Sequence, residues 1–89
     1  MLPIQPTSKF KKDLKKALRQ GRNLKGLSAV LKTLSIPRPL PTEFKDHKLK
    51  GKWSDFREYH IEPDFLLIYT ITDFELRPTR LGSHTELFD

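Results

Sequence analysis

The sequence predicts a small α+β domain in which two N-terminal helices pack on a small, mainly antiparallel sheet. Two observations lead to this prediction. Apolar residues recur at helical spacing in the N-terminal part, and strand-like apolar segments separated by short turns follow in the C-terminal part. Helices followed by a run of strands are typical of the α+β class. Because 89 residues is the size of a domain with one core, we expect residues 1–89 to form a single domain.

Two amphipathic helices account for the N-terminal part. We expect one helix over residues 8–20, capped by Thr7 or Ser8, and a second over residues 24–35, capped by Asn23. Their apolar faces are expected to pack on the strand over residues 66–71, and they consist of Phe10, Leu14, Leu18, Leu27, Val30, Leu31 and Leu34.

Extended segments make up most of the remainder. A short one is expected over residues 2–5, and after a proline-rich connector three strands follow at about residues 53–61, 65–71 and 75–81. Pro78 lies within the last strand, and because proline cannot donate to a sheet ladder, we expect a bulge or an edge there. Residues 83–89 are expected to form a short tail.

The charge of the chain indicates a polyanionic partner. Seventeen Lys and Arg residues against eleven Asp and Glu residues give a net charge of +6 and a pI near 9.8. Nucleic acid is a typical partner at such a pI, and an acidic protein and an anionic membrane are the alternatives. The densest basic stripe, which we expect to contact RNA, lies on the first helix and consists of Lys12, Lys15, Lys16 and Arg19.

The chain lacks cysteine, which excludes disulfide bonds, thiolate catalysis and cysteine-based zinc sites. A reducing cytoplasm is therefore the expected location. No apolar run approaches the roughly 18 residues of a membrane span, so we expect no membrane partner. Prolines interrupt the N-terminus where a signal peptide has its apolar core.

Three histidines and one aspartate lie where elements are expected to end: His47 in a loop, His60 near a strand end, Asp64 in the next turn and His84 after the last strand. No pair has metal-ligand spacing, so neither a metal nor another cofactor is predicted. Beside a basic surface, these groups suit RNA cleavage through its own 2′-hydroxyl, which needs a base, an acid and a cation at the phosphate. Composition and spacing alone leave a structural role open for each.

Several blocks of the C-terminal half resemble one family in the same order. The stretch DHKLKGKW, residues 46–53, resembles the D-H-x-L-x-G-x-W signature of YafQ-like toxins in the RelE superfamily. The stretch RLGSHTELF, residues 80–88, is similar to the family ending R-x-G-[ST]-H-x-x-L-F. Between them lie the blocks FRE at residues 56–58, HIEPD at residues 60–64 and LIY at residues 67–69.

This resemblance implies a microbial-RNase-like fold and a function. The expected activity is metal-independent cleavage of mRNA in the A site of the 30S ribosomal subunit, beside rRNA, with inhibition of translation. The expected protein partner is a cognate antitoxin. The alternative, which composition alone does not exclude, is a non-catalytic basic RNA- or ribosome-binding module.

The resemblance also implies roles for individual residues. His84 is the expected general acid, and the base is left open among His47, His60 and Asp64. Arg80 is expected to hold the phosphate. Phe88 is expected to position the substrate, as is Phe65, which stands where some family members carry tryptophan. An enzyme requires the catalytic groups and Arg80 to converge on one site, whereas a binding module does not.

Overall fold

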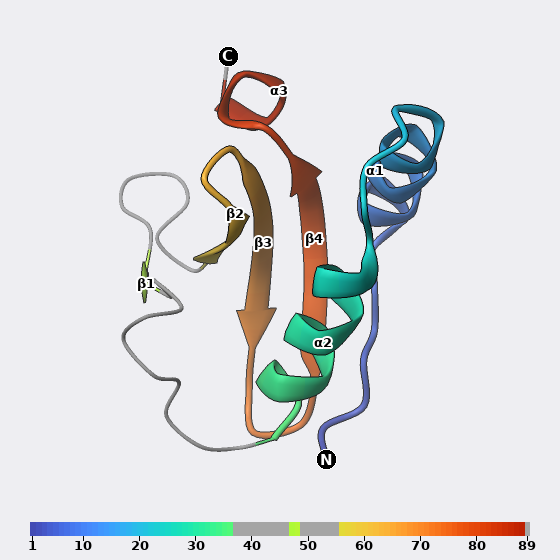
Figure 1. Cartoon of the computed structure of the whole chain (residues 1–89). Coiled ribbons are helices and arrows are strands. Elements are labelled where there is room, and N and C mark those ends of the chain that lie inside the picture. The colour runs from blue at the N-terminus through green and yellow to red at the C-terminus, as the bar shows by residue number, and fades with distance from the viewer. Residues whose placement is uncertain (37–46, 49–55, 89) are drawn as a thin grey trace.

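The computed structural model describes residues 1–36, 47–48 and 56–88. Among these residues two helices come first, four antiparallel strands follow and a short helix comes last, which confirms the α+β class (Figure 1). In chain order the elements are α1 (Ser8–Arg19), α2 (Lys25–Leu34), β1 (His47–Lys48), β2 (Arg57–Glu62), β3 (Phe65–Ile71), β4 (Leu76–Gly82) and α3 (His84–Phe88). The strands form one sheet in the order β1-β2-β3-β4.

Both N-terminal helices begin at side chains that accept backbone N–H groups. Thr7 caps α1 as expected, since its Oγ1 accepts the Phe10 N–H at 3.1 Å, and the same hydroxyl donates to the Thr79 carbonyl of β4 at 2.9 Å. Asn23 Oδ1 accepts the Lys25 N–H at 3.0 Å, one residue before the position that formally caps α2. The first and last residues of both helices lie within two residues of those predicted from the sequence.

The proline in the last strand produces the expected bulge. Ile68 of β3 pairs with Arg80, but the next residue, Tyr69, pairs with Pro78, so Thr79 is the extra residue. The Pro78 carbonyl turns outward and accepts the Thr7 N–H at 2.9 Å. The bulge thus joins β4 to the start of α1.

Three elements differ from the sequence expectation. His47 was expected in a loop, but it lies in β1, where it pairs with Glu58 of β2. Residues 84–88 form α3 where a tail was expected. The short strand at residues 2–5 is reduced to a single parallel bridge between Ile4 and Leu76. The strand pairing of His47 and the single bridge of Ile4 depend on distant residues, which local sequence patterns do not report, whereas α3 begins at a local capping box between Ser83 and Glu86.

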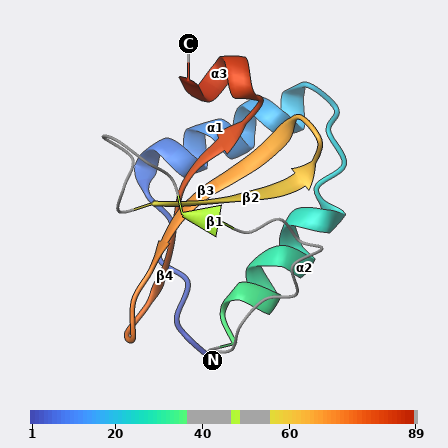
Figure 2. The same cartoon turned by 90° about the vertical axis from the view of Figure 1, so that its left-hand side faces the viewer.

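Two apolar clusters lie on opposite faces of the sheet. The larger one packs α1 and α2 against alternate residues of β3, namely Phe65, Leu67 and Tyr69. The smaller one joins the intervening Leu66 and Ile68 to Leu87 of α3 and Phe56. Figure 2 shows α1 crossing behind the strands and α3 at the end of β4. No helix in the described ranges is long and apolar enough to cross a membrane.

The expected helix–sheet core is correct in outline and wrong at two positions. Leu18 is 60 % exposed, because it lies about 80° around α1 from Phe10 and points past the sheet. Ile68 is fully buried, but on the α3 face, because successive residues of a strand point to opposite faces. Leu14 and Leu31 are partly buried at the margin of the larger cluster.

Candidate active site

A contact between a turn and a helix start forms the centre of the site. Asp64 lies in the β2–β3 turn and His84 is the first residue of α3. The Asp64 Oδ1 accepts the His84 backbone N–H at 2.9 Å and lies 2.6 Å from His84 Nδ1. The backbone hydrogen bond, followed by the side-chain contact, lowers the pKa of Asp64. The carboxylate therefore orients the imidazole through Nδ1, and Nε2 is not part of this contact.

Two further residues extend this centre across the sheet face. The ring centroids of His60 and His84 are 5.7 Å apart, with a tilt of 44°. His60 Nε2 lies 3.2 Å from Oε1 of Glu58, which is only 7 % exposed. Glu58 and His60 are two residues apart on β2, so their side chains leave the sheet on the same face.

The aromatic residue at the end of α3 lies beside this group. The ring centroids of Phe88 and His84 are 6.5 Å apart, and Phe88 is 40 % exposed. Phe65, in contrast, belongs to the helix-side core with 1 % exposure, and the Arg22 guanidinium covers its ring at 4.4 Å.

Arg80 lies in a row of paired residues that crosses the whole sheet. Strand register pairs His47 with Glu58, Glu58 with Ile68 and Ile68 with Arg80. The His47 backbone is therefore part of this row, whereas its side chain lies outside the described part of the structure. Arg80 is the end of the row, on the last strand.

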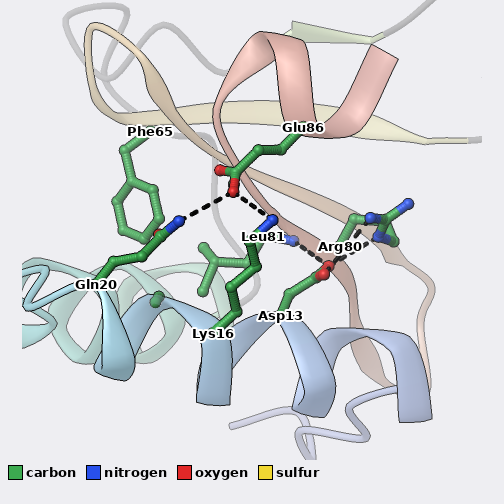
Figure 3. Close-up of a pocket in the computed structure, with 9 residues that line it drawn as sticks. Asp13, Lys16, Gln20, Phe65, Arg80, Leu81 and Glu86 are labelled. Atoms are coloured by element: carbon green, nitrogen blue, oxygen red, sulfur yellow. Dashed lines mark hydrogen bonds and ion pairs between the residues drawn. The ribbon is translucent and has the colours of Figure 1, made fainter. Parts of the chain in front are cut away.

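The guanidinium of Arg80 turns toward α1 (Figure 3). Its Nε donates to Asp13 Oδ2 at 2.7 Å, and its Nη2 lies 3.5 Å from Asp13 Oδ1. The Leu81 N–H donates to the same Oδ2 at 3.0 Å, so one carboxylate holds both the side chain and the adjacent backbone of β4. Asp13 thus orients Arg80 from a helix 67 residues away in sequence.

A capping box defines the start of α3. Ser83 Oγ accepts the Glu86 N–H at 3.1 Å, and Glu86 Oε1 accepts the Ser83 N–H at 2.9 Å. Glu86 also ties this helix to α1, through Lys16 Nζ at 2.8 Å and Gln20 Nε2 at 3.3 Å (Figure 3). These contacts, the one to Lys16 first, lower the pKa of Glu86 to about 2. The helix that carries His84 is therefore held in two places, by Asp64 of the β2–β3 turn and by the contact of Glu86 with Lys16 of α1.

The predicted basic stripe is exposed along α1. Lys12, Lys15, Lys16 and Arg19 are all solvent-accessible, although Lys16 is bound to Glu86. Three members of the stripe therefore remain outside the ion pairs found in the described ranges.

The fold also brings together residues that offer metal ligands, although sequence spacing predicts none. One ligand atom from each of Glu58, His60 and His84 lies within 4.8 Å of the others. Imidazole and carboxylate ligands of this kind suit zinc or copper.

The sequence prediction missed three carboxylates at or near the site. Glu58 stands two residues before His60 in a predicted strand, which is the spacing for a shared face. Ser83 and Glu86 match the capping-box pattern. Asp13 is the single acidic residue among residues 1–42, which marks it as unusual on a basic helix.

The comparison with protein families identifies the class of this protein as a bacterial toxin of type II toxin–antitoxin systems. The family model described as "Bacterial toxin of type II toxin-antitoxin system, YafQ" matches residues 2–89, and the chain belongs to this family. A similar curated protein is the mRNA interferase toxin YafQ of Escherichia coli strain K12. It is 41 % identical over 87 residues, which cover 96 % of this chain and 94 % of that protein.

Solved structures of similar toxins have the same fold. A copper-bound mutant toxin from Helicobacter pylori is 48 % identical, covers 99 % of this chain and 100 % of its own, and superimposes with a TM-score of 0.92. YafQ in the DinJ–YafQ toxin–antitoxin complex of E. coli is 37 % identical, with coverage of 99 % and 98 % and a TM-score of 0.90. These matches confirm the family and the fold predicted from the sequence.

Proposed function

We propose that this chain is an mRNA interferase, an endoribonuclease that cuts mRNA in the A site of the ribosome and so inhibits translation. One observation carries the proposal. His84 contacts the Asp64 carboxylate, and its ring centroid lies 5.7 Å from that of His60. His60 in turn contacts the carboxylate of Glu58. The mRNA interferase name of the E. coli relative and the net charge of +6 support a polyanionic substrate.

His84 is the proposed general acid. Contact with the Asp64 carboxylate favours a proton on Nδ1, and in the imidazolium form Nε2 carries the second proton. When the 2′-hydroxyl attacks the phosphorus, the bond to the 5′-oxygen breaks and that oxygen needs a proton. Nε2 of His84 supplies it, and Asp64 stabilises the charged ring until then.

The 2′-hydroxyl proton goes to a base, for which we favour the pair of His60 and Glu58. Asp64 is less suited, because its Oδ1 already accepts two contacts from His84. The proton is taken at His60 Nε2, because His60 Nδ1 is buried. The buried Glu58 carboxylate lies 3.2 Å from Nε2, where it can stabilise the imidazolium that forms. His47 is the remaining candidate, since its backbone pairs with Glu58.

Other residues are proposed to neutralise charge on the phosphate and to position the nucleobase of the substrate. Arg80 uses Nε and Nη2 for Asp13, which leaves Nη1 for a phosphate oxygen. The exposed ring of Phe88 can stack on a nucleobase beside His84. Phe65 is buried, so we propose that it contributes by supporting the Arg22 guanidinium above its ring.

The surroundings of the site suit two partners. The exposed stripe of Lys12, Lys15, Lys16 and Arg19 is proposed to contact phosphates of ribosomal RNA. An acidic antitoxin is proposed to silence the enzyme by covering the site around His84, as the positive surface would attract its carboxylates. The E. coli DinJ–YafQ complex supports a protein partner of this kind.

The test is single-turnover cleavage of mRNA on programmed ribosomes. His84→Ala is expected to reduce the rate roughly 10²–10⁴-fold, the usual contribution of a general acid. Thr85→Ala, the neighbouring exposed residue of α3, is the control and should cut at nearly the wild-type rate. A substrate with a 5′-sulfur leaving group, which departs without protonation, should restore His84→Ala but not Arg80→Ala.

Two outcomes would contradict this function. If a 2′-deoxy substitution at the cleavage position is tolerated, then the attacking group is not the 2′-hydroxyl. If the wild-type chain binds ribosomes and leaves mRNA intact, the protein is a binding module and the histidine cluster has another role.

A further inference from the structure

A surface recess lies between the N-terminal half of α1 and β4. It is an open pocket of about 270 Å³, and its lining consists of Lys9, Lys12, Asp13 and Arg80. Asp13 and Arg80 also belong to the candidate active site, whereas Lys9 and Lys12 do not. The volume is slightly below the roughly 300–1,000 Å³ of pockets for drug-sized ligands, so the occupant is a smaller group.

The lining is cationic, and its one carboxylate is already engaged. Asp13 accepts the Arg80 Nε–H and the Leu81 N–H through one oxygen. Lys9 and Lys12 lie three residues apart on an exposed helix face, so they point to the same side. Neither lysine takes part in the ion pairs found among residues 1–36, 47–48 and 56–88. Three cations against one bound carboxylate leave a positive site.

The chemistry of this site matches a phosphate group. Two lysine ammonium groups bind phosphate oxygens as point charges, and the Arg80 guanidinium adds positive potential at the wall of the pocket. The pocket lies near the first turns of α1, where the helix dipole adds positive potential. Arg80 also connects the pocket to the active site, because it pairs through Ile68 with Glu58 in one row across the sheet.

We propose that this pocket binds a backbone phosphate of RNA other than the scissile one, and that Lys9 and Lys12 are its ligands. This inference rests on the proposed function. An RNA strand that binds at both His84 and the pocket contacts the protein at two points, and this fixes which nucleotide lies at the candidate active site. The phosphate belongs either to mRNA or to ribosomal RNA, and the chemistry is the same for both.

Inorganic phosphate is the first probe, titrated into the whole chain while backbone amide resonances are followed. We expect saturable shifts at Lys9, Lys12 and Arg80. The double variant K9Q/K12Q should lower this affinity by about tenfold or more, because it removes both lysine ligands, and a tenfold change corresponds to about 1.4 kcal/mol. The control K11Q/K25Q removes the same charge from exposed lysines outside the pocket and should keep the wild-type affinity.

Two results of this titration would overturn the proposal. The first is shifts confined to the residues around His84, because phosphate would then bind only at the active site. The second is an equal drop in affinity in both double variants, because net charge alone would then explain the binding.

Ribosome binding separates the two sources of phosphate. Because K9Q/K12Q removes two cations that bind phosphate, its slope of log affinity against log salt should become shallower by about 1.4–1.8, and that of the control should not. Weaker binding that requires mRNA in the A site identifies an mRNA phosphate, whereas weaker binding on empty ribosomes identifies ribosomal RNA. Unchanged binding in both states, or weaker binding only toward an acidic antitoxin, would overturn the proposal. Absent mRNA cleavage by the wild-type chain would instead refute the proposed function.

Discussion

The two faces of the sheet are built differently, although the same strands supply both. On the helix side, Phe65, Leu67 and Tyr69 of β3 are sealed beneath α1 and α2 in a continuous apolar core. On the opposite side, among the described residues, Leu66 and Ile68 form a small cluster with Leu87 and Phe56. Glu58 and His60 share that second face, and His84 lies beside them.

The alternation of side chains along each strand therefore places the main core on one face and the candidate catalytic groups on the other. Neighbouring residues of a strand point to opposite faces, so one side chain enters the helix-side core and the next lies on the face of the candidate active site. Contacts on the helix side are numerous and apolar, so they determine the free energy of unfolding. The polar contacts described on the other face, between Glu58 and His60 and between Asp64 and His84, should instead determine activity. Substitutions on the two faces should therefore separate these two quantities.

The largest effect is expected on the helix side. Leu67→Ala removes a fully buried side chain from the larger cluster and should lower the free energy of unfolding by roughly 2–5 kcal/mol. Urea or thermal unfolding measures it. Leu18→Ala is the matched control, because Leu18 is 60 % exposed and its loss should change stability by less than about 0.5 kcal/mol. Equal effects would mean that the helix-side core is placed incorrectly.

The next effect should appear in activity and not in stability. Asp64→Asn removes the charge that orients and stabilises the His84 ring, so single-turnover cleavage should slow by roughly 10²-fold or more. The Asp64 side chain is 68 % exposed, so the free energy of unfolding should change by less than about 0.5 kcal/mol. Asp73→Asn, an exposed aspartate in the β3–β4 turn, serves as the control. A loss of stability matching the loss of rate would break the division between the faces.

The smallest effect concerns the link between α3 and α1. Because contacts in the fold hold the pKa of Glu86 at about 2, against 4.5 in the unfolded chain, its stabilisation is complete above about pH 4.5. It is lost as the pH falls toward 2. Glu86→Gln should therefore cost roughly 1–2 kcal/mol at neutral pH, allowing for solvent screening, and nothing near pH 2.

Stability curves against pH for Glu86→Gln, wild type and Glu62→Gln check this prediction. Glu62 is an exposed carboxylate at the end of β2, so its variant should follow the wild type throughout. A constant difference between Glu86→Gln and wild type from pH 2 to 7 would remove ionisation of Glu86 as the cause.

The helix-side core could be predicted from the sequence because it follows local periodicity. Phe10 and Leu14, four residues apart, mark the buried face of α1, and Pro78 marks the bulge in β4 through the hydrogen bond it cannot donate. Leu18 was misplaced because it lies at the margin of that helical face, where periodicity alone does not distinguish buried from exposed.

The active-site face was harder to predict because its contacts join distant parts of the chain. His84 and Asp64 are 20 residues apart, and Arg80 and Asp13 are 67 apart. The sequence supplied His60, Asp64 and His84, and the resemblance supplied their expected roles, but Glu58 beside His60 and Asp13 beside Arg80 were not predicted. Whether a carboxylate meets a given histidine depends on register and on the direction of a side chain, and these are properties of the folded chain.

The outer edge of β4 has a consequence for how the sheet meets other chains. Unpaired edge strands invite the addition of a further strand from a partner or a second copy. Here the N-terminal segment covers that edge: Leu76 N–H donates to the Pro3 carbonyl at 3.0 Å, and the Leu76 carbonyl accepts the Gln5 N–H at 2.8 Å. The covering segment contains Pro3 and Pro6, which have no N–H to offer an incoming strand. A partner that extended the sheet from β4 would first have to displace this segment.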